Sequence, residues 1–562
     1  MVKIGLEMHQ QLDTGKLFCR CPSELSDEYD FSFTRVLRPV VSELGRVDRA
    51  ALVEARRGRR ITYFASTRNS CAVEWDEEPP HEPDAEAIAV ASQIARLMNA
   101  KLVDEVHFMR KILIDGSAVT GFQRTALIAT DGEVEGVKIS TVCLEEDSAR
   151  PVAGGFNLDR LGIPLVEVAT EPSMTSGEEA KKVAKKLGTI FRMAKVRRGI
   201  GTIRQDLNVS IPGGARVEIK GVQELNLIPT IVKFEVARQE RLLQLRERFS
   251  ARFSRIEDVT GLFKSSKSRV FRGKKVYAAV MRGASGLFAE RLHARKHVGK
   301  EIAEYVKSFG YGGFTHSDEK GFETSKLRKA LRAHKDDLII LAAGDRRIIE
   351  LVKERVRQFS AGIPEDTRRA NPDGSTSFLR PLPTGARMYP ETDIPPFRMP
   401  DVRPLETPAQ RLEKLKRLMP REIAKKLYLS PDYHLFEELG GEPVLGVVIT
   451  EYLPALRRKG FSPSKEHIAE ILELYRSGKL AKDALFEALK RKCSGETIDA
   501  RTVDPGEVRE FVRNLVHERR DYVLSSPNPV KGLMGPVMKK YRGKLPGKWI
   551  SLIIREEIEK LK

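Results

Sequence analysis

The chain has 562 residues, 41% of them hydrophobic and 7% aromatic, which suits a folded protein of three to five domains at roughly 100–200 residues per domain. Lysine and arginine total 98 against 78 for aspartate and glutamate, which gives a net charge of +20. This excess favours a polyanionic binding partner, with nucleic acid as the first candidate. Two alternatives are less favoured: surface ion pairs of a thermophilic protein, which would give nearly balanced charge, and binding to a membrane surface. The chain has five cysteines, no apolar run near the ~18 residues that span a bilayer, and no secretory signal pattern. These features exclude the secreted and membrane classes and predict a cytoplasmic protein.

The first 249 residues predict an α+β domain built on a largely antiparallel sheet. Several segments are rich in β-branched residues and alternate in polarity, as half-buried strands do. Helical periods interrupt these segments, and one of them follows the proline-rich entry PPHEPD. Strands are predicted at 2–12, 103–114, 136–147, 164–172, 202–212 and 215–222, and helices at 84–99, 177–191 and 228–249.

The rest of the chain predicts a small α/β module followed by helices. A strand and turn at 276–288 precede helical periods at 303–308, 323–333 and 346–359, and a stretch crowded with proline and glycine then breaks regular structure. From about Leu405 apolar residues recur at helical spacing almost to the end. We expect an α+β multidomain protein whose domains span 1–255 plus 383–400, 256–382, 401–460 and 461–562.

A basic tail lies near the C-terminus. Between Tyr522 and Ile554 there is no acidic residue, and aromatic residues stand among the cations, a composition typical of nucleic-acid contacts. The alternative is a solvated face of a surface helix. The cations are Lys531, Lys539, Lys540, Arg542, Lys544 and Lys548.

Acidic residues in apolar surroundings mark a candidate metal site. Glu7 and His9 stand two apart in a predicted strand, so both point to one face. Buried acids are costly unless they are paired or bind a metal. The oxygen-rich set favours Mg²⁺ or Mn²⁺, and the histidine shifts this preference slightly toward Mn²⁺ or Zn²⁺. Structural ion pairs with Arg160, Arg204 or Lys220 would explain the same acids equally well. The further acids are Glu145, Glu146, Asp147, Glu167 and Glu171.

The cysteines and the phosphate-binding motifs are less informative. Cys19, Cys21 and Cys71 lack a convincing fourth ligand, His81 being only conceivable, so structural thiols are favoured over zinc. No Gly-Lys pair is followed by Ser or Thr, and there is no GxSxG elbow. If this protein uses ATP, it does not bind it through a P-loop.

These residues, in their order, resemble a known family. The segments are IGLEMHQQLDTGKLFCRC, VCLEEDSAR, FNLDRLGIPLVEVATEP, IRQDLNVSI, VEIKGVQELN and ARMYPETDIPPF. Together they are similar to the signature series of the GatB/GatE family, the B/E subunits of aminoacyl-tRNA amidotransferases. GLEMHQQL, where bacterial B subunits usually read GLEVHVQL, points to the archaeal E subunits of glutamyl-tRNA(Gln) amidotransferase. The resemblance covers essentially the whole chain.

The resemblance implies a fold and a reaction. It implies a β-rich, cradle-like catalytic domain, and an insertion at 256–382 like that of bacterial-type aspartyl-tRNA synthetases. It also implies that ATP phosphorylates the γ-carboxylate of Glu-tRNA(Gln) and that ammonia then displaces phosphate to give Gln-tRNA(Gln). The ammonia would come from a partner, the asparaginase-like D subunit, in a heterotetramer of two D and two E subunits.

The resemblance also implies site residues. The metal, Mg²⁺ or alternatively Mn²⁺, would be held by the catalytic residues Glu7, His9, Glu145 or Glu146, and Glu167. ATP or the acyl end would be lined by Arg204, Asp206, Asn208 and Lys220, with Glu391 and Asp393 closing over it, and the basic tail would bind tRNA. Two departures stand out: Ser148 and Arg150 occur where many relatives read LEEDAGK, and the cysteine set is incomplete, so no zinc is assigned.

Two alternatives to an amidotransferase remain open. A metal-dependent RNA-processing enzyme would assemble the same carboxylates around two metal ions. A non-catalytic tRNA-binding protein would keep the acids without using them. Incubation with Glu-tRNA(Gln), ATP, Mg²⁺ and ammonium separates the three by Gln-tRNA formation, RNA cleavage or binding without turnover.

Overall fold

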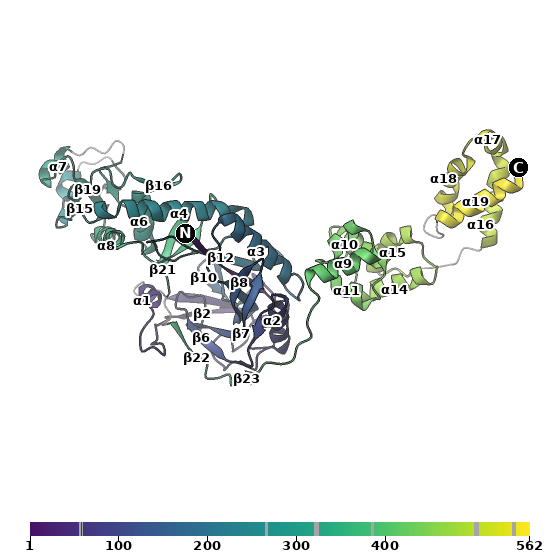
Figure 1. Ribbon diagram of the computed structural model, residues 1–562, viewed down its shortest axis with the longest axis horizontal. Coiled ribbons are helices and arrows are strands. Elements are labelled where there is room, and N and C mark those ends of the chain that lie inside the picture. The colour runs from purple at the N-terminus through teal and green to yellow at the C-terminus, as the bar shows by residue number, and fades with distance from the viewer. Residues whose placement is uncertain are drawn as a thin grey trace. The chain divides into compact units, whose positions relative to one another are not determined.

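Figure 1 shows the computed structural model of the chain, which describes residues 1–55, 58, 60–264, 268–319, 325–383, 387–498, 505–541 and 547–561. The chain divides into two compact units, Met1–Leu405 and Glu406–Lys562. Among the described residues, no helix combines the length and the apolar composition that crossing a bilayer requires.

An 11-stranded sheet forms the centre of the first unit, and its strands are antiparallel except where β13 pairs with β20. The order across this central sheet is β21 (Thr376–Pro381), β20 (Asp366–Ala370), β13 (Val217–Lys220), β12 (Ile203–Ser210), β1 (Lys3–Gln11), β11 (Pro164–Thr170), β8 (Val137–Glu146), β7 (Phe122–Val134), β6 (Phe108–Ile112) and β22 (Met388–Pro390), with β4 (Lys101–Leu102) paired to β7. The unit is therefore α+β, as the sequence predicts.

The two faces of the central sheet differ because side chains alternate along each strand. In β1, Ile4, Leu6 and Met8 are fully buried in the core, whereas Glu7 and His9 point to the opposite face. Three helices cover the apolar face in Figure 1: α2 (Ala85–Leu97), α3 (Gly177–Phe191) and α4 (Ile228–Gln244).

Helix capping agrees with the predicted starts of the first two of these helices. The Asp84 carboxylate accepts the backbone N–H of Ala87 at 2.6 Å at the start of α2. The Ser176 hydroxyl accepts the N–H of Glu179 at 3.2 Å at the start of α3. Both caps satisfy amides that the first helical turn leaves without a partner.

Smaller elements complete this part of the unit. A four-stranded sheet has the order β2 (Phe31–Arg35), β3 (Ile61–Ala65), β10 (Gly155–Asn157) and β9 (Arg150–Val152), and β5 (Glu105–Val106) pairs with β23 (Phe397–Arg398). The short helices are α1 (Arg49–Ala55), η1 (Leu225–Leu227) and α5 (Arg246–Phe249).

The inserted module ends earlier than the predicted residue 382. β20 and β21 belong to the central sheet, because β20 pairs in parallel with β13 and Thr367 lies opposite Glu218. A pairing of strands so distant in the sequence leaves no local signal. The module itself contains β14 (Glu257–Asp258), η2 (Thr260–Phe263), β15 (Val276–Met281), β16 (Arg291–His293), β17 (Lys296–His297), α6 (Val298–Ser308), β18 (Thr315–His316), α7 (Ser325–Ala330), β19 (Leu338–Ala343) and α8 (Arg347–Ala361).

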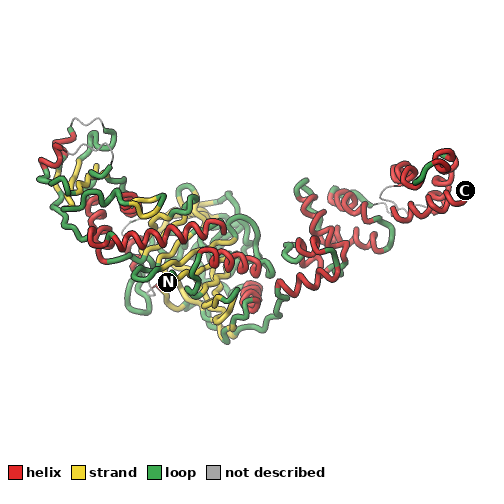
Figure 2. Tube along the Cα trace, turned by 45° about the horizontal axis from the view of Figure 1, so that its top comes forward, coloured by secondary structure: helices red, strands yellow, loops and turns green. Residues whose placement is uncertain are grey.

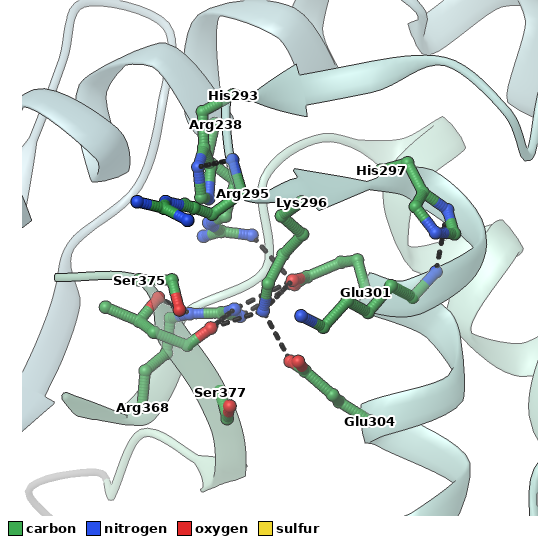
Figure 3. Close-up of polar contacts among 12 residues, drawn as sticks. Arg238, His293, Arg295, Lys296, His297, Glu301, Glu304, Arg368, Ser375 and Ser377 are labelled. Carbon is green, nitrogen blue, oxygen red and sulfur yellow. Dashed lines mark hydrogen bonds and ion pairs between the residues drawn. The ribbon is translucent and has the colours of Figure 1, made fainter. Parts of the chain in front are cut away.

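A buried network of charges joins the module to the central sheet (Figure 3). Glu301 of α6 is its centre and is fully buried. Its carboxylate accepts hydrogen bonds from Arg368 of β20 at 2.7 and 2.8 Å and from Arg238 of α4 at 3.1 Å, and Lys296 Nζ lies 3.2 Å away. The cations are Arg238, Lys296, Arg355 and Arg368, and the anions are Glu235, Glu301, Glu304 and Asp366, so the charges of these described residues balance.

The second unit is built of helices joined by loops, and Figure 2 shows no strand among its described residues. One apolar core runs from Leu415 to Leu489, so the helices after the predicted boundary at 460 share a core with those before it. The helices are α9 (Pro408–Leu418), α10 (Arg421–Leu427), α11 (Tyr433–Glu438), α12 (Pro443–Val447), the π-helix η4 (Val448–Tyr452), α13 (Leu453–Arg457), α14 (Lys465–Arg476), η5 (Lys482–Ala484), α15 (Leu485–Cys493), α16 (Pro505–Glu518), α17 (Arg520–Ser525), α18 (Pro529–Tyr541) and α19 (Gly547–Leu561).

Part of the basic tail lies on α18. Lys531, Lys539 and Lys540 are exposed there, and the Lys540 ammonium lies 4.2 Å from the centre of the Phe511 ring. The buried side of α18 packs into a separate apolar core with α16 and α19. Arg542, Lys544 and the side chain of Lys548 lie outside the described residues.

Candidate active site

The strand register brings the acidic residues around His9. On β1, His9 lies opposite Glu167 of β11, and Glu7 lies opposite Asp206 of β12. His9 Nε2 is 3.0 Å from Glu167 Oε2 and 3.5 Å from Glu7 Oε1. We call the face of the central sheet that carries these four residues and Glu145 the polar face.

Only one of the two neighbouring glutamates of β8 reaches this cluster. Glu145 groups with His9 and Glu167, whose ligand atoms all lie within 4.8 Å of one another. Glu146 points to the other face, where it accepts the backbone N–H of Arg124 at 2.8 Å. Consecutive residues of a strand point to opposite faces. Of the two predicted alternatives, Glu145 therefore lies in the cluster, and the assignment of Glu146 to the metal is corrected.

Lys111 is a member of the cluster that the sequence analysis missed. Its ammonium contacts the carboxylate of Glu145 and lies 3.6 Å from Glu167 Oε2. Lys111 stands on β6, separated from Glu145 by β7, and nothing in the sequence links these strands. The alternation within FMRKI places Lys111 and Arg110 on opposite faces, but does not say which face is polar.

The electrostatics of the cluster follow from burial and neighbouring charges. Burial, together with Glu167, raises the pKa of Glu7 to about 7. Burial alone would lower the pKa of His9, but the hydrogen bond to Glu167 and the nearby carboxylates outweigh it and raise that pKa to about 9. Although burial opposes ionisation of Glu167, Lys111 and His9 hold its pKa well below the usual range. A divalent cation bound here would displace the proton of His9.

The residues expected around the nucleotide are joined to the cluster by strand pairing and ion pairs. Asp206 lies on the polar face and groups with Glu7 and His9 within 4.8 Å. Lys220 pairs with Asp206 at 2.7 Å and with Glu218 at 2.8 Å. Arg204 lies opposite His9 and contacts the buried Asp147, and Asn208 lies opposite Gly5.

Glu391 and Asp393 lie behind the polar face. Glu391 accepts hydrogen bonds from Arg110 at 2.5 Å and Arg124 at 2.6 Å, and Arg110 also pairs with Asp393 at 2.9 Å. Arg124 is the residue whose backbone binds Glu146 on that same side. The expectation that these two acids close over the nucleotide is therefore corrected, because the two arginines hold them on the opposite side of the sheet.

The donor set on the polar face fits a divalent cation. Two groups share His9: one adds Glu7 and Asp206, and the other adds Glu145 and Glu167. Carboxylate oxygens with one imidazole nitrogen suit Mg²⁺ or Mn²⁺ better than a soft metal.

A second group of potential ligands joins the N-terminal cysteines. Cys19, Cys21, Cys71 and Glu74 place their ligand atoms within 4.8 Å of one another, with Cys19 Sγ 3.0 Å from Glu74 Oε1. Glu74 is the fourth group that the sequence analysis did not find, although the spacing C-x-x-E is visible at 71–74. Three thiols and a carboxylate match the donor types and number of a tetrahedral zinc site. His81 pairs with Glu78 at 3.3 Å.

Comparison with known proteins decides the family. The family model described as the GatB/GatE catalytic domain matches residues 2–403. The chain belongs to the GatB/GatE family. It is similar to the E subunit of glutamyl-tRNA(Gln) amidotransferase from Archaeoglobus fulgidus (43% identity, 100% of this chain and 97% of the relative) and from Methanocaldococcus jannaschii (40%, 100% and 99%). The corresponding E subunit from Pyrococcus furiosus is 43% identical over 95% of this chain and 94% of its own length.

The family match confirms the resemblance inferred from the ordered motifs. The matched region, residues 2–403, contains the whole polar face and also spans the inserted module. The carboxylate cluster thus lies in the region that the family model describes as catalytic.

Glu145 and Glu146 provide a matched pair for mutation. We expect Glu145→Gln to lower the rate of amidation by about 10²-fold or more, because it removes a carboxylate from the cluster. Glu146→Gln should leave the rate within a few-fold of wild type and instead lower the melting temperature, because it weakens the contact with buried Arg124. Single-turnover rates and thermal unfolding of both variants measure this; equal rate losses would contradict the assignment of faces.

Proposed function

We propose that this chain is the catalytic subunit of a tRNA-dependent amidotransferase that converts Glu-tRNA(Gln) to Gln-tRNA(Gln). ATP phosphorylates the γ-carboxylate of the glutamate, and ammonia then displaces the phosphate. The observation that carries this proposal is the cluster of Glu7, His9, Glu145, Glu167 and Asp206 on the polar face, within the region that matches the family's catalytic domain.

The arrangement of charges suits phosphoryl transfer between two anionic reactants. Such a reaction depends on positioning and charge neutralisation more than on covalent catalysis. Mg²⁺ held by the cluster would neutralise phosphate oxygens. Lys111 contacts Glu145 at one end of the cluster and Lys220 pairs with Asp206 at the other, so ion pairs hold both carboxylates in place. Arg204, anchored by Asp147, lies opposite His9 in the strand register.

The ammonia would come from a partner. The sequence lacks a GxSxG nucleophile motif, and the curated relatives are named as E subunits of an amidotransferase. We propose an asparaginase-like D subunit as the donor, with two D and two E subunits in the complex. Enclosed delivery would keep ammonia from protonation in water.

The source of nitrogen tests this division of labour. With Glu-tRNA(Gln), ATP, Mg²⁺ and ammonium chloride, the chain alone should form Gln-tRNA(Gln), whereas asparagine or glutamine should support the reaction only after the D subunit is added. Acid-gel separation of the aminoacyl-tRNAs measures both. Three results would contradict the proposal. The purified chain alone could take nitrogen from asparagine or glutamine, it could cleave the RNA, or it could bind tRNA without turnover.

The basic tail would bind the tRNA body. Exposed Lys531 and Lys539 on α18 would contact phosphates, and each lost phosphate contact lowers the salt dependence of affinity by about 0.9 in log–log slope. We expect Lys531→Ala/Lys539→Ala to raise KM for tRNA and flatten this slope, with kcat nearly unchanged at saturating tRNA. Lys185→Ala/Lys479→Ala, at exposed sites elsewhere, is the control. If the tail variant keeps the wild-type salt slope, these lysines belong to a solvated helix face and do not bind tRNA.

We also propose that the inserted module is related to the insertion of bacterial-type aspartyl-tRNA synthetases. The module has its own four-stranded sheet, in the order β14-β15-β19-β18, and an apolar core formed only by its own residues. Both features support its being a unit acquired as a whole.

A further inference from the structure

The inserted module has two sides, which its four-stranded sheet separates. Side chains alternate between the two sides along each strand. On one side, Ala279 of β15 belongs to an apolar core with α6 and α8. On the other side, Val276 of β15 belongs to a separate core, to which the segments 260–275 and 325–335 contribute. These two segments, which include η2 and α7, therefore cover the side of the sheet opposite α8.

The two covering segments contain no acidic residue. At the chain's average of 78 acidic residues in 562, their 24 described residues would hold about three. They hold ten cations instead, and we call this side of the module its basic face. The cations of the basic face are Lys264, Arg269, Arg272, Lys274, Lys275, Lys326, Arg328, Lys329, Arg332 and Lys335.

Apolar side chains anchor both segments to the module. The Phe271 side chain is buried, and its ring centre lies 4.7 Å from that of Phe263. In the second segment, Leu327 and Leu331 are buried in the same core. The backbone next to these anchors is held in place, so neighbouring side chains present their charge to solvent from fixed positions. The exposed cations beside the anchors are Arg272, Lys274, Lys326 and Lys329.

Carboxylates border the basic face but do not balance its charge. Glu257 points to this side, because it lies opposite Ala278 of the same core. Asp337 is buried and pairs with Arg282 at 2.7 Å. In the part of the chain that the structure describes, no ion pair joins a cation of the basic face to a carboxylate. The bordering acids are Glu257, Asp258, Asp336, Asp337 and Asp345, five against ten cations.

A phosphate backbone matches the charge of this surface. Nucleic-acid backbones carry closely spaced negative charges, and lysines and arginines that neutralise them release bound counterions, which favours association. Such contacts position the nucleic acid without reading its sequence. The proposed function brings a tRNA to this unit, because the glutamate on the end of the tRNA has to reach the polar face, which lies in the same compact unit as the module.

We propose that the basic face of the module binds the phosphate backbone of the tRNA substrate. The choice of tRNA as the RNA rests on the proposed function, whereas RNA binding by this face is measured without amidation. The basic face is distinct from the basic tail, which belongs to the other compact unit. It gives the catalytic unit a tRNA contact of its own, so that the affinity for tRNA does not depend on the tail alone.

The test compares Lys274→Ala/Lys329→Ala with Lys300→Ala/Lys307→Ala, which removes two exposed lysines of α6 on the other side of the module. Filter binding over a series of salt concentrations measures the Kd for uncharged tRNA(Gln). We expect the basic-face variant to bind about 5-fold more weakly at low salt and to flatten the log–log salt slope by about 1 or more. The control should keep the wild-type Kd and slope. Lys274→Arg/Lys329→Arg retains both charges and should also bind like wild type.

Three outcomes would overturn the proposal. The alanine variant could keep the wild-type affinity and salt slope, which would make the basic face a solvated surface. The arginine variant could lose as much affinity as the alanine variant, which would show that charge is not what matters. The alanine variant could bind tRNA normally but lose binding to the D subunit or to phosphatidylserine vesicles, which would assign the face to a protein or a membrane. If the wild-type protein forms no Gln-tRNA(Gln), the proposed function fails, and the filter-binding data still decide whether the basic face binds RNA.

Discussion

Replacing His9 by alanine or Glu167 by glutamine should lower the rate of Gln-tRNA(Gln) formation by about 10²-fold or more at saturating Mg²⁺. Both variants remove a donor from the cluster, and loss of Glu167 also leaves Lys111 with one carboxylate neighbour in place of two. The affinity for tRNA should stay near wild type, because the polar face lies in a different unit from the basic tail.

Matched controls separate this effect from general damage. His107→Ala and Glu171→Gln change exposed residues of the same domain outside the cluster and should keep wild-type rates. Single-turnover kinetics with acid-gel analysis gives the rates, and filter binding gives the tRNA affinity. Near-normal turnover of both His9→Ala and Glu167→Gln would show that the acids are structural.

The largest effect on stability should follow from Glu301→Gln in the buried charge network (Figure 3). This nearly isosteric change leaves Arg238, Lys296 and Arg368 without the carboxylate that all three contact. Removing one partner of a buried ion pair costs about 3–5 kcal/mol, because the remaining charge stays desolvated. We expect a loss of this size in the free energy of unfolding of the first unit, measured by urea denaturation.

Two further variants test the mechanism of this loss. Glu350→Gln removes a surface carboxylate that pairs with Arg346 and Arg347, and should cost less than about 1 kcal/mol. The double variant Glu301→Gln/Arg368→Met should cost less than the sum of its single changes, since each removes a charge that the other leaves unpaired. A loss below about 1 kcal/mol for Glu301→Gln would contradict a network held by desolvated charges.

Local patterns predicted the strands and helices that position the cluster. The alternation of β1 identifies Glu7 and His9 as neighbours on one face, and the helical periods recover α2 and α3 to within two residues at each end. These features depend on residues a few positions apart, where side-chain spacing determines which face is buried.

Features that depend on distant pairing were not predictable in this way. The sequence does not show that β20 joins β13, which moves the module boundary, or that Arg110 and Arg124 hold Glu391 behind the sheet. Glu145 and Glu146 differ only in the face of the central sheet to which they point, and the pairing of β8 with β11 decides which of the two lies beside Glu167. Glu74 completes the cysteine group through a turn that brings 71–74 beside Cys19.

A crystal soaked in Mn²⁺ and measured at the manganese absorption edge tests the central claim most directly. We expect an anomalous peak on the polar face, with His9 and at least two of Glu7, Glu145, Glu167 and Asp206 as ligands, and we expect that peak to be lost in His9→Ala. A peak elsewhere, or no peak on the polar face at a Mn²⁺ concentration that supports amidation, would contradict the assignment of this cluster as the catalytic metal site.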